Sequence, residues 1–482
     1  MKVTICNPPW PGEGFGARSD VRWPHKRRDK YIEYPIYLAY TVAVVEEAGF
    51  EASFIDAIME ELDIAQFAER VREIGPDLLV LECSTPSIHF DLESAEAVKR
   101  ALPEIKIALV GSHSTFFHKD ILEENPAVDA VVRGEFELTV RELARAIDEA
   151  THWSSVAGLS FRDGDNIVVN PDRPLIASLD QMPFPARHIV KSIGYRAAIY
   201  TGDKCTAVVS SRGCPFQCTF CVWPNTLYGH RFRARSAQNV VDEMEEIEKR
   251  FGIDEIYFDD DTFTIDRVRV MEICRLIQER QLTLSWIVQA RVDTVDREML
   301  LAMKEAGCHY ILFGIESGSP EMLAKMKKRI TLDKAREAIR LCNELGIKSQ
   351  AFFLFGIPGE TPETIQQSIH FAKELGASTV QFAVAIPQPG SPLYEECTQN
   401  GWLIYEDWED FASNKAMIET PQLSRAEMED ARVRAYREYY FRPQFILREA
   451  RRVRHPRDLK RLWRGARSVL ARLSFFESAR SR

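Results

Sequence analysis

Residues 210–221 read SSRGCPFQCTFC and place Cys214, Cys218 and Cys221 in a CxxxCxxC pattern directly after the apolar run 207–209. Soft thiolate ligands favour iron, and iron–sulfur clusters are held by cysteine. Three cysteines on one loop would leave one iron of a cubane [4Fe–4S] cluster open to a ligand from outside the protein. The alternatives are a structural zinc site or three incidental cysteines. Zinc sites usually draw four ligands from paired CxxC units or Cys/His sets, and no second pair is visible.

The same stretch resembles the signature of the radical SAM enzymes. This resemblance implies that the amino and carboxylate groups of S-adenosylmethionine (SAM) chelate the open iron. One electron from the reduced cluster would then cleave the sulfonium and release a 5′-deoxyadenosyl radical. By this resemblance Cys214, Cys218 and Cys221 are both the metal-binding and the catalytic residues.

The composition describes a globular chain of several domains. It has 482 residues, 45% hydrophobic and 28% charged, and a soft prior of ~150 residues per domain suggests about three units. No apolar run reaches the ~18 residues of a membrane span, and the N-terminus enters a strand-like run without a signal-peptide pattern. The seven cysteines outside the loop have no framework spacing, which is typical of reduced thiols. We therefore expect a cytoplasmic protein.

Residues 1–150 alternate strand-like and helical stretches. The strand-like runs are 3–7, 52–56, 78–83, 106–110 and 128–132, and the amphipathic stretches between them are 36–48, 64–74, 90–102 and 136–150. This alternation predicts an α/β domain with a doubly wound, flavodoxin- or Rossmann-like parallel sheet. A ligand of such a sheet binds beyond the carboxyl ends of its strands.

A domain of this kind directly before a radical SAM core resembles the cobalamin (B12)-binding domain of the class B, cobalamin-dependent radical SAM family. The resemblance implies that four residues line the nucleotide tail and lower face of the corrinoid: Ser84, Thr85, Gly111 and Ser112. The DxHxxG motif, which in some cobalamin proteins supplies a histidine to cobalt, is absent after the first strand, and many members of the family lack it. His113 follows the fourth strand, where a lone histidine is more often structural than a ligand. The alternative is a Rossmann-like module that binds another partner.

Residues 151–204 predict a linker. The runs 156–162 and 166–169 flank Asp163-Gly164-Asp165 and predict a β-hairpin. The proline-rich residues 183–187 then cross between the domains. We expect this segment to pack over the cofactor cleft.

Residues 205–400 repeat strand then helix six times, with strands expected at 207–210, 255–259, 285–290, 310–314, 350–355 and 379–385. Six parallel βα units forming a partial (β/α)6 barrel match the radical SAM core. Chemistry in such barrels lies at the carboxyl ends of the strands.

Polar residues after the second and third core strands resemble SAM contacts of the family. Asp260 or Asp261 would contact the methionine ammonium group, although an acidic run is also typical of a solvated turn or a helix N-cap. Arg291 would pair bidentately with the SAM carboxylate. An ion pair of Arg291 with Asp293 or Asp296 is the alternative.

The next strand ends carry further matches to the family. Glu316 and Ser317 lie in the segment that resembles its ribose-contacting motif, and Gly356 and Pro358 lie in the turn that resembles its fifth-strand motif.

The C-terminal region, 401–482, reads as helical. Residues 431–482 hold 16 Lys and Arg against 4 Asp and Glu, although the whole chain has a net charge of −10. Within it, 459–473 predict a basic amphipathic helix, which is typical of a peripheral membrane surface. A contact with the acidic body or another protein is the alternative. Nucleic acid is disfavoured by that body.

These observations lead to one principal hypothesis. The chain is identified as a member of the cobalamin-dependent radical SAM enzymes, similar to members of the hopanoid pathway and of the anaerobic magnesium-protoporphyrin ester cyclase type. It would modify an unactivated carbon of a hydrophobic, lipid- or porphyrin-like substrate, by C-methylation or oxidative cyclisation, with electrons from a reductase, ferredoxin or flavodoxin. The alternatives are a radical SAM enzyme whose first domain only docks a partner, and a non-enzymatic iron–sulfur electron-transfer protein.

Overall fold

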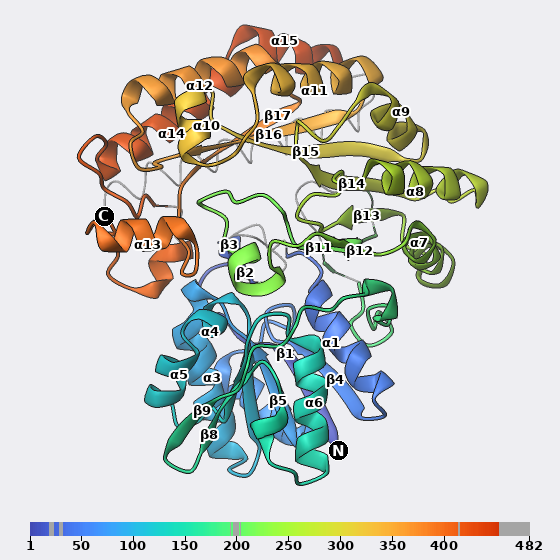
Figure 1. Cartoon of the computed structure of the whole chain (residues 1–482), viewed down its shortest axis with the longest axis vertical. Helices are drawn as coiled ribbons and strands as arrows, with labels where there is room; N and C mark the ends of the chain where they lie inside the picture. Colours follow the sequence, from blue (N-terminus) through green and yellow to red (C-terminus); the bar gives the residue numbers. More distant parts are fainter. Residues whose placement is uncertain are drawn as a thin grey trace.

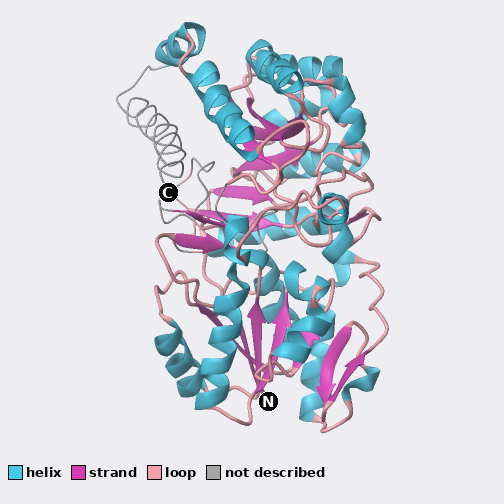
Figure 2. Ribbon diagram, turned by 90° about the vertical axis from the view of Figure 1, so that its left-hand side faces the viewer, coloured by secondary structure: helices cyan, strands magenta, loops and turns pink. Residues whose placement is uncertain are grey.

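The computed structural model describes residues 1–18, 24–27, 32–192, 194–195, 202, 204–412 and 415–452. Two sheets with flanking helices lie one above the other, and a small hairpin, β2 (Phe15–Ala17) with β3 (His25–Arg27), lies near the level where they meet (Figure 1). The side view in Figure 2 shows the same two stacked layers.

The N-terminal sheet has the order β4-β1-β5-β6-β7-β8-β9. Its five parallel strands are β1 (Lys2–Asn7), β4 (Glu51–Asp56), β5 (Leu78–Glu82), β6 (Lys106–Val110) and β7 (Ala130–Val132). Numbered along the chain, these strands run 2-1-3-4-5, the flavodoxin-like order, whose ligand position lies between β1 and β5. The predicted doubly wound α/β domain is thereby confirmed.

Helices cover both faces of this sheet. They are α1 (Ile36–Glu47), α2 (Ile64–Ile74), α3 (Ile88–Ala101), α4 (Ser112–Phe116), α5 (His118–Glu124) and α6 (Glu137–Asp148). The ends of α2 show why the sequence forms a helix there. Asp63 and Gln66 make a reciprocal capping box at its start, and Gly75 ends it with φ 61°.

The predicted linker hairpin is present and belongs to the N-terminal sheet. β8 (Leu159–Asp163) and β9 (Asn166–Val169) form a hairpin, and β8 pairs antiparallel with β7. The hairpin therefore extends the N-terminal sheet. The physical reason is that β7 would otherwise present an edge of unpaired backbone groups. Tyr195, later in the linker, donates to Asp56 at the end of β4 (2.7 Å), and the packing of the linker over a cofactor cleft stays a prediction.

The second sheet is parallel throughout and has the order β10-β13-β14-β15-β16-β17. Its strands are β10 (Cys205–Val208), β13 (Glu255–Phe258), β14 (Ser285–Ala290), β15 (Cys308–Glu316), β16 (Lys348–Phe355) and β17 (Thr379–Val384). The helices after its strands are α7 (Ala237–Phe251), α8 (Arg267–Glu279), α9 (Arg297–Glu305), α10 (Pro320–Lys325), α11 (Leu332–Leu345), α12 (Pro362–Leu375) and α13 (Pro392–Gln399). Within the described residues, the first and last strands of this order are not paired, so the sheet forms the predicted partial barrel.

β10 ends earlier than expected because residues 209–212 leave the sheet to begin the cysteine loop. β11 (Ser211–Arg212) pairs there with β12 (Arg233–Ala234).

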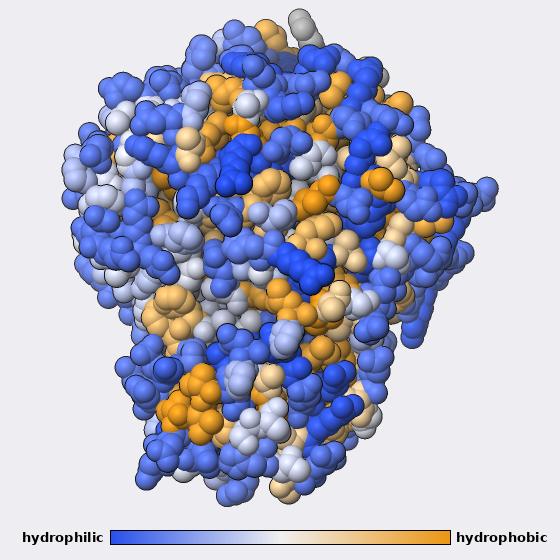
Figure 3. Space-filling model, viewed as in Figure 1, coloured by the Kyte–Doolittle hydropathy of each residue, from blue (hydrophilic) through white to orange (hydrophobic). Residues whose placement is uncertain are grey.

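After η5 (Trp408–Ala412), α14 (Arg425–Tyr440) packs against β17 and α12, and α15 (Pro443–Arg452) follows it. The expected amphipathic helix at 459–473 lies outside the described residues. Among the residues that are described, none of the helices is both long and apolar enough to span a membrane. Figure 3 shows a mainly polar face with several apolar patches, some at the level between the two sheets.

Candidate active site between the two sheets

The cysteine loop presents three accessible thiols. Cys214, Cys218 and Cys221 are each half-buried, whereas all the other cysteines of the chain are buried. Gly213, just before the loop, has φ 80°, and a Cβ there would lie 2.3 Å from the carbonyl oxygen of Arg231. Only glycine therefore lets the chain turn from β11 into the loop.

Backbone hydrogen bonds hold the middle of this loop from two sides. The amide of Thr219 donates to the carbonyl of Met326 (3.1 Å), beyond β15, and its carbonyl accepts from the amide of Leu393 (2.8 Å), beyond β17. The loop consequently spans the mouth of the partial barrel, where the carboxyl ends of the strands converge.

The donor set fits an iron–sulfur cubane. Among the described residues, no three His, Cys, Asp or Glu side chains converge closely enough to hold a single metal ion. A cubane receives each thiolate on a different iron and so does not need that convergence. Burial and then Asp261 raise the pKa of the Cys214 thiol. A bound metal overcomes such a shift, since a coordinating thiol is deprotonated.

Asp260 and Asp261 occupy different positions. Asp260 is fully buried and accepts hydrogen bonds from the Ser210 amide (2.7 Å) and from the hydroxyls of Ser210 (2.5 Å) and Ser211 (2.6 Å). Its carboxylate thus holds the start of the cysteine loop. Asp261 is half-buried, and its charge acts on Cys214. Asp261 is the more accessible of the two carboxylates, and which of them contacts the SAM ammonium stays a prediction.

Arg291 forms the ion pair that was the alternative to SAM binding. Its guanidinium donates to both carboxylate oxygens of Asp293 (2.9 Å each) and to the carbonyl of Lys328 (2.8 Å). It also lies 3.5 Å from the ring centroid of Phe216, in the cysteine loop. A cation over an aromatic face is attracted to it, so Arg291 holds the loop from the β14 side. Asp296 instead caps α9.

Glu316 and Ser317 point in different directions. Glu316 ends β15 with φ 72°, an uncommon conformation for a residue other than glycine. Its carboxylate accepts from the ammonium of Lys328 at 2.8 Å. Ser317 is fully buried and pairs with the Ser368 hydroxyl of α12 at 3.0 Å. Of this predicted pair, Glu316 is linked to the cysteine loop through Lys328, and the contacts of both residues with the ribose stay predictions.

Lys328 is a site residue that the sequence analysis missed. It is only 6% exposed, and its ammonium lies 5.9 Å from the ring centroid of Phe220 in the cysteine loop. Burial disfavours its charge, but Glu316 and then Cys218 outweigh that effect and raise the pKa of Lys328. The run Lys325–Arg329 looks like a solvated basic turn in the sequence. The left-handed φ of Lys327 (52°) and Arg329 (56°) turns Lys328 inward.

The turn after β16 is built around a buried carboxyl. The amide of Gly356 (φ 89°) donates to Glu360, and Pro358 is buried. A Cβ on Gly356 would lie 2.6 Å from the sulfur of Met428 in α14. The positive φ of Gly356 favours glycine, and the close approach of Met428 leaves little room for a larger side chain there. Whether Gly356 and Pro358 also contact SAM stays a prediction.

Replacing Glu360 with Gln should change how stability depends on pH. Burial raises the pKa of Glu360 from 4.5 to about 8. Between these two values the folded state holds a proton that the unfolded state has lost, so the wild type loses stability as pH rises through this range. Glu360→Gln should remove that loss, measured as the denaturant midpoint against pH. Glu363→Gln, at an exposed carboxyl nearby whose pKa is lowered, should keep the wild-type slope. If the denaturant midpoint of Glu360→Gln falls with pH as steeply as that of the wild type, the loss of stability does not come from Glu360.

The four residues predicted to line cobalamin lie together at the carboxyl edge of β5 and β6. Ser84 and Thr85 are buried, Ser112 is half-buried, and Gly111 joins β6 to α4. His113 is buried, lies 3.1 Å from the Thr85 hydroxyl, and has its pKa lowered to about 3 mainly by burial. A neutral imidazole paired with Thr85 supports the structural interpretation of this histidine. The contacts of the four residues with cobalamin stay predictions.

Gly111 provides a direct test of how tightly this edge is built. Its φ of 122° and ψ of 176° belong to a region essentially restricted to glycine, and a Cβ would lie 2.3 Å from the carbonyl oxygen of Cys83. Gly111→Ala should destabilise the fold by more than the ~1–3 kcal/mol of backbone strain alone. Gly49→Ala, where φ is 89° and the Cβ would meet nothing within 4 Å, isolates the strain. Equal shifts in the denaturant midpoints of the two variants would contradict a clash at Gly111.

Two buried charges at the same edge were also missed. Arg18 and Asp91 form an ion pair of 2.7 Å, and both are almost fully buried. Arg18 also donates to Asn7, at the end of β1, and to the hydroxyl of Ser87 (3.2 Å). The pair therefore lies at the flavodoxin-like ligand position between β1 and β5. The partners are separated by 73 residues, and no local pattern signals such a contact.

Aromatic side chains connect this edge to the chain beyond β17. Phe116 contacts Tyr394 of α13 (ring centroids 6.0 Å apart), and His113 contacts Trp408 of η5 (5.2 Å). Tyr405 stacks on Trp408 (5.2 Å). The carboxyl edge of the N-terminal sheet thus faces the region of the barrel mouth and the cysteine loop.

Two family models match the chain. The model of the radical SAM superfamily matches residues 208–372, and the model of the B12 binding domain matches residues 27–144. The first match contains the cysteine loop and the strand ends from β10 to β16. The second contains the sheet edge with Ser84 and Gly111.

Several proteins are similar to this chain over most of its length. An uncharacterised methyltransferase of Pyrococcus horikoshii is 32% identical over 415 residues, 86% of this chain and 89% of the relative. The anaerobic magnesium-protoporphyrin IX monomethyl ester cyclase of Cereibacter sphaeroides is 30% identical over 458 residues, 92% of this chain and 71% of the relative. Among solved structures, the cobalamin-dependent SAM radical enzyme OxsB, with aqua-cobalamin and SAM bound, shares the fold with a TM-score of 0.74 at 16% identity. The match covers 97% of this chain and 70% of that structure.

The matched domains, the extent of the relatives and the shared fold agree with the site geometry. They set aside both the non-enzymatic alternative and a first domain that only docks a partner. The chain belongs to the cobalamin-dependent radical SAM enzymes, and its cofactors are a [4Fe–4S] cluster, S-adenosylmethionine and cobalamin.

Proposed function

We propose that this enzyme transfers a methyl group to an unactivated carbon of a hydrophobic substrate. The observation that carries the proposal is the direct contact between the cysteine loop region and the carboxyl edge of the N-terminal sheet. Arg212, two residues before Cys214, donates to Glu135 (2.8 Å), which follows β7 at that edge, and a Cβ on Gly134 would lie 3.9 Å from the carbonyl oxygen of Leu227. A substrate held between these two parts would reach both a radical source and a methyl carrier.

The proposed roles of the residues follow their positions. Cys214, Cys218 and Cys221 hold the cluster, and Asp261 and Glu316 contact the ammonium and ribose of SAM. When bound, the cluster and SAM supply a radical that removes a hydrogen atom, and cobalamin supplies the methyl group. Arg291 and Asp260 keep the cysteine loop in place. Ser84, Thr85, Gly111 and Ser112 form the cobalamin edge.

The proposed substrate class rests on the aromatic side chains that line the junction. Phe116 is 39% exposed and Tyr405 is 38% exposed, although both lie in the aromatic group that joins α4 to α13 and η5. Accessible aromatic faces bind flat or aliphatic apolar ligands by burying their surface. A lipid- or porphyrin-like substrate fits such a wall better than a highly charged one.

Oxidative cyclisation is the second candidate. It is supported by the cyclase relative, which matches 92% of this chain. Both candidate reactions begin with the same hydrogen abstraction and therefore use the same residues.

The nucleoside products separate the two reactions. Methyl transfer should yield S-adenosylhomocysteine together with 5′-deoxyadenosine, because one SAM donates the methyl group and the 5′-deoxyadenosyl radical from a second SAM takes up the hydrogen atom. Cyclisation should yield 5′-deoxyadenosine without S-adenosylhomocysteine. The measurement is liquid chromatography of anaerobic reactions that contain reductant, cobalamin and candidate lipids or porphyrin esters. Substrate-dependent 5′-deoxyadenosine without S-adenosylhomocysteine would contradict the methyltransferase proposal.

A further inference from the structure

Four buried charges join the N-terminal domain to the strand that leads into the cysteine loop. Arg212 of β11 donates to Glu135 (2.8 Å) and to Glu137 (2.6 Å), and Arg233 of β12 donates to both oxygens of Glu135 (3.1 and 2.9 Å). None of the four is more than 5% exposed. Glu135 and Glu137 follow β7 of the N-terminal sheet, whereas Arg212 comes two residues before Cys214. We call these four residues the interdomain quartet.

The surroundings of the quartet allow Arg212 little freedom. Its guanidinium lies 5.7 Å from the ring of Tyr37 and 5.3 Å from each of the rings of Tyr40 and Tyr228. Tyr37 and Tyr40 belong to α1 of the N-terminal domain. Two carboxylates and three rings therefore fix a planar group in one orientation.

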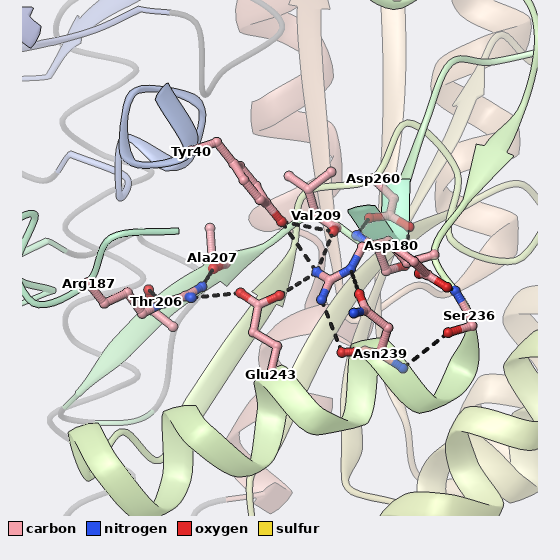
Figure 4. A network of polar contacts seen from close by, with 12 residues as sticks. Tyr40, Asp180, Arg187, Thr206, Ala207, Val209, Ser236, Asn239, Glu243 and Asp260 are labelled. Atoms are coloured by element: carbon pink, nitrogen blue, oxygen red, sulfur yellow. Dashed lines mark hydrogen bonds and ion pairs between the residues drawn. The ribbon is translucent and has the colours of Figure 1, made fainter. Parts of the chain in front are cut away.

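A second buried network holds the strand just before Arg212 (Figure 4). Arg235 donates to the carbonyl of Val209 (3.0 Å) and pairs with Glu243, and Arg187 donates to the carbonyl of Ala207 (2.6 Å) and also pairs with Glu243 (2.6 Å). Tyr40 of α1 donates to the same Val209 carbonyl (3.4 Å). Tyr40 of the N-terminal domain and Arg187 of the linker thus both contact backbone carbonyls of the segment that precedes Arg212.

Stability alone does not account for such an arrangement. Burying charges costs desolvation energy, and replacing a buried ion pair by apolar residues is often neutral or stabilising. What charged pairs add is a defined geometry. At this position the geometry concerns the distance from the cysteine loop to the carboxyl edge of the N-terminal sheet, because Glu135 follows β7 at that edge.

We propose that Glu135 and Glu137, through Arg212, are positioning residues that set the distance and orientation of the iron–sulfur cluster relative to cobalamin. The N-terminal domain then does more than bind the corrinoid. Through the quartet it aligns the cysteine loop with the corrinoid. This inference rests on the proposed function in one respect, since both centres must be loaded for their separation to matter.

The test measures the separation of the two centres directly. The full-length protein is reconstituted with iron, sulfide and cobalamin and poised so that the reduced cluster and cob(II)alamin are both paramagnetic. Pulsed electron paramagnetic resonance then reports the distribution of distances between them. For the wild type we expect one narrow distribution of distances. For Glu135→Gln/Glu137→Gln we expect a broad distribution instead. Iron and corrinoid contents should stay near those of the wild type.

Glu142→Gln is the matched control. Glu142 also lies on α6 and pairs with an arginine, Arg173 (2.9 Å), but near the surface of the N-terminal domain. It should keep the narrow distribution. If the double variant does not fold, Glu137→Gln is measured instead, because it leaves the pair of Glu135 with Arg233 intact. A wild-type distribution in the variant that folds would overturn the inference while leaving the proposed function untouched. A wild type that takes up no corrinoid would overturn both.

Discussion

Cys218→Ala should abolish assembly of the cluster and, with it, the formation of 5′-deoxyadenosine from SAM. Cys218 is the middle residue of the CxxxCxxC loop, and the residue next to it, Thr219, is anchored on both sides by backbone hydrogen bonds. No described cysteine outside the loop is exposed enough to replace it. The loss of 5′-deoxyadenosine formation should exceed the ~10–100-fold loss of activity that is typical when an outer-shell partner of a metal site is removed. Iron and sulfide content, visible absorbance and 5′-deoxyadenosine yield measure it.

Cys205→Ala is the control for this experiment. Cys205 is buried at the start of β10, in the strand that leads to the loop. Its replacement should leave iron content at the wild-type level. Retained 5′-deoxyadenosine formation by Cys218→Ala would refute the ligand assignment.

Lys328→Met should destabilise the protein by ~3–5 kcal/mol, because it leaves the buried Glu316 carboxylate without its 2.8 Å partner. It should also lower the reduction potential of the cluster. Reduction adds negative charge next to Cys218, and a nearby cation favours that charge. Denaturant unfolding measures the first effect, and a redox titration followed by electron paramagnetic resonance measures the second.

Two controls separate these effects. Glu316→Gln/Lys328→Met removes both charges and should recover much of the lost stability, but only part of the potential, because removing the Glu316 carboxylate offsets part of the loss of the Lys328 charge. Lys325→Met breaks an exposed pair with Glu321 (3.1 Å) in the same segment and should cost less than ~1 kcal/mol. An unchanged potential in Lys328→Met would show that Lys328 acts only on Glu316.

Much of the fold could be predicted from local patterns. In the N-terminal sheet, the run 106–110 is an apolar strand in the sequence and in the structure, as β6. Its neighbours β5 and β7 are equally buried. Parallel strands covered on both faces are continuous apolar runs, and the amphipathic helices between them carry a 3.6-residue period. Each of these two signals depends only on residues that are close together in the sequence, so the fold class was predictable.

The predicted site residues divide according to what holds each side chain. The three cysteines share one loop, so their spacing alone indicated a common ligand. Asp260 and Asp261 are adjacent in the sequence, yet only tertiary contacts with Ser210 and Ser211 separate their roles. The position of Ser317 is also decided by a tertiary contact, because its hydroxyl pairs with that of Ser368 in α12.

By itself, the sequence determined how the reaction of this protein starts, with SAM at a cluster held by three cysteines. Its cysteine spacing and its alternating strands and helices indicated a cluster loop and two α/β domains, and their resemblance to known families identified a radical SAM core behind a cobalamin domain. Only the tertiary structure decided how these parts face each other. The partners in the decisive contacts are far apart in the chain: Arg212 lies 77 residues from Glu135, and Arg18 lies 73 residues from Asp91. Propensity and periodicity act over a few residues, whereas a buried charge is satisfied by whichever opposite charge the packing of whole domains brings to it.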